Sequence, residues 1–188
     1  MIKIGITGSV ASGKTTASKI ISSKRGPLFS ADNVVRKLYK KNNFKKLIAR
    51  KLNFKVDNNF KKKLIDKILQ RKEILKKLEK IIHPIVRREM FMFLRKNKNK
   101  KLLFFEIPLL IESKLTKYFD VLIFIKSKKS LRLKRYILKG GSIQLFSLLE
   151  KHQIKDTKKM KFCDHIVVNN KSLSILKRKL SNIIKLYE

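Results

Sequence analysis

The sequence lacks what disulfide-built or cysteine-built sites need. It has one cysteine, Cys163, among 188 residues, no tryptophan, three prolines and six glycines. A single thiol excludes an intrachain disulfide and a cysteine-based metal site, so we assign Cys163 to the core. No internal repeat or low-complexity linker is present. This length without linkers predicts one domain over residues 1–188, with small appendages.

Long apolar runs are also missing. No stretch remains apolar over the length that a bilayer requires. The first residues alternate as a strand does and do not show a basic segment followed by an apolar one. We therefore expect a cytoplasmic protein that does not engage a membrane.

Acidic residues are scarce, with 13 Asp and Glu against 49 Lys and Arg, and the formal net charge is +36. Such a field attracts polyanions. The excess is mostly lysine spread over the whole chain, which is typical of codon drift in an AT-rich genome. No element combines concentrated charge with interleaved aromatic residues or glycines, as a sequence-reading domain does. We expect no specific nucleic-acid partner, only weak salt-sensitive binding.

The clearest motif is "GSVASGKT", residues 8–15, which has the spacing of a P-loop. An alternating strand precedes it and a helical pattern follows, which is the context the motif needs. In a P-loop, backbone N–H groups surround the β-phosphate, so Lys14 would reach the β- and γ-phosphates and Thr15 would bind Mg²⁺. The expected ATP contacts within the loop and the helix after it are Gly8, Ala11, Ser12, Gly13, Lys14, Thr15 and Thr16. The alternative is a glycine turn that merely links a strand to a helix.

Apolar runs separated by helical patterns predict an α/β fold. The expected strands are the initial "IKIGI", then "GPLFS", "KLLFFE", "DVLIFIK" and "DHIVVNN". Continuous apolar runs favour strands buried on both faces, and alternation with helices favours a parallel, doubly wound sheet. Residues 44–97 show helical spacing without a strand, so we predict a helical insertion there, broken near His83-Pro84. After a hinge at Gly140-Gly141, we predict one helical segment over 142–159.

Two carboxylates follow predicted strands, at the edge where open α/β sheets bind ligands. Asp32 follows the second strand and is either a base beside an acceptor hydroxyl or a helix N-cap, a role that Ser30 also suits. Glu106 ends the third strand. It either holds Mg²⁺ through water or only terminates the strand.

Five segments in order, "GITGSVASGKTT", "SADNVVRKLY", "LEKIIHPIV", "EIPLLIES" and "CDHIVVNN", resemble the dephospho-CoA kinase family over nearly the whole chain. The resemblance implies a three-layer P-loop kinase fold with five parallel strands, a helical acceptor-binding region and a short lid, about residues 135–159. It also implies ATP-dependent phosphorylation of the ribose 3′-hydroxyl of dephospho-CoA, the last step of coenzyme A synthesis. The implied partners are ATP with Mg²⁺ and dephospho-CoA, and we expect a monomer or small homo-oligomer.

The resemblance also assigns residues. Asp32 matches the aspartate beside the acceptor, Thr7 the threonine before the loop, and His83 with Pro84 a pair facing the acceptor. Arg135 matches a catalytic lid arginine, which would neutralise the transferring phosphoryl group. Asn169 matches an asparagine near the adenine. Without the resemblance, His83-Pro84 is equally a helix break with a surface imidazole, and Arg135 one more solvated basic position.

Four positions depart from the family pattern. Ser30 and Glu106 each stand where aspartate is usual, and both keep polar chemistry. Lys61 and Lys139 stand where arginine is usual, and a lysine offers a point charge instead of a bidentate fork. These changes concern rate and affinity. Two other functions fit the motifs: a small P-loop kinase for a nucleoside monophosphate or a metabolite hydroxyl, or a basic nucleotide-switched protein that binds nucleic acid.

Overall fold

A computed structural model describes the whole chain, residues 1–188. Its centre is one parallel sheet of five strands in the order β2-β3-β1-β4-β5. The strands are β1 (Ile2–Gly8), β2 (Leu28–Ser30), β3 (Leu102–Glu106), β4 (Val121–Lys126) and β5 (His165–Val168). The predicted parallel α/β fold is thus confirmed. Because the strands are parallel, their carboxyl ends share one edge, and the P-loop after β1 lies there beside the ends of β3 and β4.

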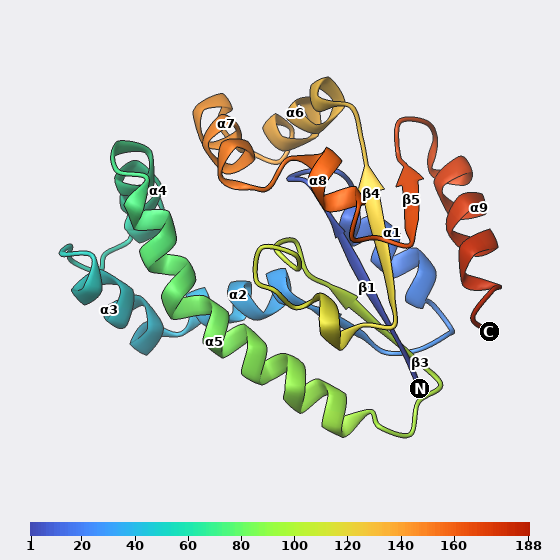
Figure 1. The fold of residues 1–188 in the computed structure, drawn as a ribbon. Helices are drawn as coiled ribbons and strands as arrows, with labels where there is room; N and C mark the ends of the chain where they lie inside the picture. Colours follow the sequence, from blue (N-terminus) through green and yellow to red (C-terminus); the bar gives the residue numbers. More distant parts are fainter.

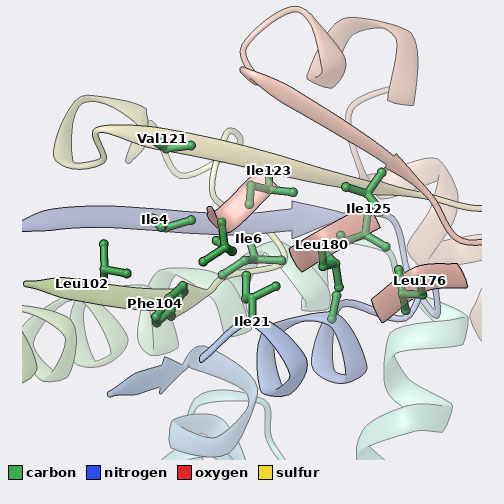
Figure 2. Close-up of a cluster of buried hydrophobic side chains, with 13 residues drawn as sticks. Ile4, Ile6, Ile21, Leu102, Phe104, Val121, Ile123, Ile125, Leu176 and Leu180 are labelled. Carbon is green, nitrogen blue, oxygen red and sulfur yellow. The ribbon is translucent and has the colours of Figure 1, made fainter. Parts of the chain in front are cut away.

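One face of the sheet carries an aliphatic core. Ile4 and Ile6 of β1 are fully buried there, between Phe104 of β3 and Ile123 of β4. Two helices cover this face, α1 (Lys14–Ser22) and α9 (Leu173–Ile184), as Figure 2 shows for Ile21, Leu176 and Leu180. This packing fixes β1, and with it the start of the P-loop.

The opposite face packs against α2 (Ala31–Lys40) and the second half of the long helix α5 (Glu73–Lys96). Its buried cluster includes Phe105, Leu122 and Met90. Gly5 of β1 points to this side, and a Cβ there would lie 2.7 Å from the Leu122 side chain. Helices thus cover both faces, which makes the three layers expected of the fold.

The first half of α5 leaves the sheet and forms an arm with α3 (Asn42–Lys51) and α4 (Phe60–Gln70), which stands apart in Figure 1. The arm has its own core, including Phe44, Ile48, Phe60, Leu64 and Leu78. The predicted break at His83-Pro84 is wrong, because α5 continues through Pro84. A proline inside a helix costs about 3 kcal/mol. The apolar residues of α5 are buried in both the arm and the sheet cluster, which offsets that cost.

Three helices lie near the carboxyl ends of β1 and β4 (Figure 1): α6 (Lys129–Ile137), α7 (Ile143–His152) and α8 (Asp156–Met160). The helical segment predicted over 142–159 is interrupted, because Gln153–Lys155 link α7 to α8 without helical structure. A single 3₁₀ turn, η1 (Thr116–Tyr118), precedes β4. None of the helices combines the length and apolar composition needed to cross a bilayer.

Candidate active site

The P-loop ends at Gly13, which has a left-handed backbone conformation and is the N-cap of α1. Gly13 has φ +98°, and a Cβ there would come within 2.2 Å of the Asn169 side-chain nitrogen, so this position requires glycine. No side chain caps α1, and the first helical backbone bond runs from Ala17 N–H to the Gly13 carbonyl. The N–H groups of the first turn therefore remain free at the positive end of the helix dipole, which suits an anion.

Lys14 is buried inside this loop with its ammonium turned toward the loop. Its Nζ donates to the Ser9 carbonyl at 2.8 Å. Burial lowers the pKa of Lys14 from 10.5 to about 8, while the Asp32 carboxylate acts in the opposite direction. The Lys14 ammonium thus loses its proton more readily than an ordinary lysine does. An anion bound nearby would favour the charged form of Lys14.

Asp32 lies on the first turn of α2 and is free of capping duty. The N-cap is Ser30, whose hydroxyl accepts a hydrogen bond from Asn33 N–H at 3.3 Å. Asp32 is open to solvent within a concave site, and the protein atoms around it raise the pKa of its carboxyl above the usual range, while Lys14 opposes that shift. No hydrogen bond contributes to that pKa. Of the two candidates for the N-cap of α2, Ser30 is the N-cap. The Asp32 carboxylate is therefore available to bind a ligand.

A cavity of about 430 Å³ opens in front of these two residues. Lys14, Asp32, Ala11 and His83 all contribute to its wall, and most of the remaining wall is apolar. The wall comes from the P-loop, α2, α4, α5, the loop after β3, and the end of α7 with the link after it. The cavity therefore joins a charged end at the P-loop, with Lys14 and Asp32, to a mainly apolar end at the arm.

Several predicted residues lie outside this wall. Thr7 is fully buried and donates to the Pro108 carbonyl at 3.0 Å, so it reaches the cavity only through Pro108. Pro84 lies on another face of α5, in a groove that Arg88 and Arg95 also line. Burial lowers the pKa of its neighbour His83. Lys61 and Lys139 are both exposed and contribute nothing to the wall.

Thr15 and Glu106 meet beside the P-loop, outside the cavity wall. The Thr15 hydroxyl donates to Oε1 of Glu106, which is 1% exposed, while Oε2 of that carboxylate has no partner. A hydroxyl and a carboxylate are hard oxygen donors, which Mg²⁺ prefers, and Mg²⁺ usually binds one or two such groups together with phosphates. An unsatisfied buried oxygen beside Thr15 fits that ion.

Arg135 and Asn169 contact the P-loop on the side away from the cavity. The Asn169 side chain donates to the Ser12 carbonyl at 2.9 Å, and Arg135 donates to the Asn169 carbonyl at 3.1 Å and to the Ser127 hydroxyl at 3.1 Å. Neither contributes to the cavity wall. Arg132, one turn earlier in α6, is buried and paired with Glu150 of α7. These residues support the loop on the side away from the acceptor end.

Three residues on the α7–α8 side belong to the site although no sequence pattern indicates them. Gln153 accepts a hydrogen bond from Val10 N–H at 3.2 Å, and Asp156 accepts one from the Ser9 hydroxyl. His152 pairs with Glu79 of α5 at 2.9 Å. None of these residues belongs to a motif that spacing could reveal, because each partner lies more than 70 positions away.

Sequence comparisons identify one family. The family model for dephospho-CoA kinase matches residues 2–174. A dephospho-CoA kinase of Zymomonas mobilis is 32% identical over 187 residues, covering 97% of this chain and 95% of its own. One from Rickettsia typhi is 30% identical, covering 98% of this chain and 97% of its own.

Solved structures similar to this chain include a dephospho-CoA kinase. A Thermus thermophilus protein has a TM-score of 0.79 at 26% identity, covering 100% of this chain and 98% of its own. A dephospho-CoA kinase from Campylobacter jejuni has a TM-score of 0.65 at 26% identity, covering 97% and 95%. A shikimate kinase from Acinetobacter baumannii, at 14% identity and a TM-score of 0.57, shares the fold. By its sequence matches over nearly its whole length and by its P-loop fold, this chain belongs to the dephospho-CoA kinase family of transferases.

Proposed function

We propose that Asp32 and Lys14 carry the family's reaction here, the transfer of the γ-phosphoryl group of ATP to the ribose 3′-hydroxyl of dephospho-CoA. This is the last step of coenzyme A synthesis, and we expect it to take place in the cytoplasm. One observation carries the proposal: the two side chains share one cavity, and the carboxylate is bound to no protein donor. A base and a phosphate-binding cation are thus placed where two substrates would meet.

Asp32 would accept the proton of the attacking hydroxyl. Its raised pKa makes it a stronger base than an ordinary aspartate. Lys14 would move from the Ser9 carbonyl to the phosphates and stabilise the charge that spreads over the transferring group. Arg135, which donates to the Ser12 carbonyl of the P-loop at 3.5 Å, would add positive charge on the nucleotide side.

Thr15 and Glu106 would hold Mg²⁺ together with the phosphates of ATP. The unpaired Oε2 of Glu106 supports this, because a buried carboxylate oxygen is costly without a partner. When bound, the ion would neutralise charge on the β- and γ-phosphate oxygens. The protein's own part is to fix two oxygen donors beside the first turn of α1.

The apolar end of the cavity would receive the rest of the acceptor. We assign the helical region of about residues 44–97 to acceptor binding, with His83 on its wall, and residues of about 135–159 to a lid. Support comes from the position of α7, whose last residue, His152, is paired with α5 across this end. Adenine would lie near Asn169, on the other side of the P-loop.

The experiment is a substrate panel with the wild-type protein, ATP and Mg²⁺. Dephospho-CoA, AMP, CMP and shikimate are offered separately, and both ADP and the phosphorylated acceptor are quantified. We expect phosphorylation of dephospho-CoA alone, with the product's phosphate on the 3′-oxygen by NMR. Faster phosphorylation of AMP, CMP or shikimate would assign the protein to another small-molecule kinase activity.

A further inference from the structure

The first residue of the link between α7 and α8 lines the cavity and also contacts the P-loop. Gln153 lines the cavity, and its Oε1 accepts the hydrogen bond from Val10 N–H at 3.2 Å. Val10 lies inside the P-loop, three residues before Gly13. Gln153 is therefore placed to relate the conformation of the phosphate-binding loop to what occupies the acceptor end.

The link is held on two sides. On the side of the loop after β3, the Ile154 N–H donates to Glu112 Oε1 at 3.1 Å, and the fully buried Lys159 ammonium lies 2.6 Å from the same oxygen. On the side of the P-loop, Asp156 accepts from the Ser9 hydroxyl. These contacts tie the link to the P-loop on one side and to the loop after β3 on the other.

The residue before Gln153 faces the acceptor end. His152 lines the cavity and pairs with Glu79 of α5, and Leu149, one turn earlier in α7, also lines it. A molecule that fills the apolar end would therefore contact the last turn of α7. Anything that orders this turn also orders the carboxamide that follows it in the chain.

We propose that Gln153 is a positioning residue that couples the two substrate sites. An occupied acceptor end holds the Gln153 carboxamide on Val10 N–H, and this fixes the P-loop in one conformation before ATP binds. The inference rests on the proposed function, because it takes dephospho-CoA as the molecule that fills the cavity. Coupling is reciprocal, so ATP would also tighten the binding of dephospho-CoA by the same factor.

The test measures the dissociation constant of a non-hydrolysable ATP analogue with and without saturating dephospho-CoA. For the wild type we expect the acceptor to tighten analogue binding about fivefold or more, the lower range of site-to-site coupling. The coupling ratio is the Kd of the analogue without dephospho-CoA divided by its Kd with dephospho-CoA. For Gln153→Met we expect a coupling ratio below about twofold. The Kd of the analogue alone should change by a smaller factor than the coupling ratio does. The matched control is Gln144→Met, on an exposed position of α7, which should keep the wild-type ratio.

A conservative variant separates positioning from a general loss of structure. Gln153→Glu keeps an oxygen for the Val10 N–H, so its coupling ratio should exceed that of Gln153→Met even though its charge weakens analogue binding overall. A ratio in Gln153→Met equal to that of the wild type, or a wild type without coupling, would overturn the inference. Phosphorylation of dephospho-CoA by the wild type is measured in parallel. Its absence would count against the proposed function instead.

Discussion

The charged end of the cavity and its apolar end differ in how far apart along the chain their parts lie. Eight consecutive residues, 8–15, supply the phosphate loop, its lysine and its threonine. The apolar end takes its wall from α2, α4, α5, the loop after β3, and α7. Phosphate recognition is thus local and uses the backbone, whereas acceptor recognition depends on how distant helices pack. The two ends should accordingly fail in different ways when they are mutated.

The largest expected effect is at the charged end. Lys14→Ala should lower turnover by about a thousandfold, since it removes the cation that stabilises the transferring phosphoryl group. The fold should survive, because the wild-type lysine is a buried charge whose pKa burial already lowers. Steady-state kinetics together with a melting curve check both statements. A fully active Lys14→Ala protein would contradict the P-loop assignment.

Asp32→Asn should have the next largest effect, about a hundredfold or more on turnover with dephospho-CoA. Asparagine keeps the size of the side chain and removes the basic site, and Ser30 remains as the cap. Melting temperature should be unchanged or slightly higher, because the raised pKa of Asp32 shows that its charged form is disfavoured in the folded protein. A stable variant with wild-type turnover would leave the base unidentified.

Leu78→Ala probes the apolar end. Leu78 is 3% exposed and lines the cavity, so the loss of its side chain should lower the free energy of unfolding by about 2–4 kcal/mol. The KM for dephospho-CoA should rise about tenfold, with the Kd of ATP within about twofold of wild type. Leu180→Ala is the matched control, because Leu180 is fully buried in α9 on the far face of the sheet. It should lose comparable stability without a change in KM.

The pH dependence of binding should differ between the charged end of the cavity, where ATP binds next to Lys14, and the apolar end. In the free protein Lys14 loses its proton near pH 8, and bound phosphates raise its pKa. At about pH 9 the binding of ATP should therefore take up close to one proton, and affinity should fall up to tenfold per pH unit above about 8. Calorimetry in two buffers of different ionisation enthalpy measures this uptake. Binding of dephospho-CoA alone should show much less, and an ATP complex without proton uptake would contradict the pKa of Lys14.

Lys139→Arg should have the smallest effect. Lys139 is exposed beside the Gly140 turn, outside the cavity wall. An arginine can engage two phosphate oxygens where lysine engages one, so turnover should be unchanged or raised by about twofold. A large loss in the same assay would show that the lid is not at about residues 135–159.

The same contrast explains what the sequence could predict. The five strands and the P-loop follow from contiguous patterns, and the structure has each of them. The break expected at Pro84 was wrong because a local rule was outweighed by burial on both halves of α5. The interruption at Gln153 was missed because the bonds that hold the link reach Val10 and Glu112, which no local pattern relates to it.

The position of β1 has a consequence for biosynthesis. It is the first strand of the chain and the central one of the sheet, yet its partners β3 and β4 begin at Leu102 and Val121. At a synthesis rate of about 5–20 residues per second, Ile4 and Ile6 wait roughly 5–20 s for a strand to pair with. During that interval an apolar strand is available to other nascent chains or to chaperones. Synonymous codon changes that slow translation between residues 40 and 100 should therefore lower the yield of folded protein.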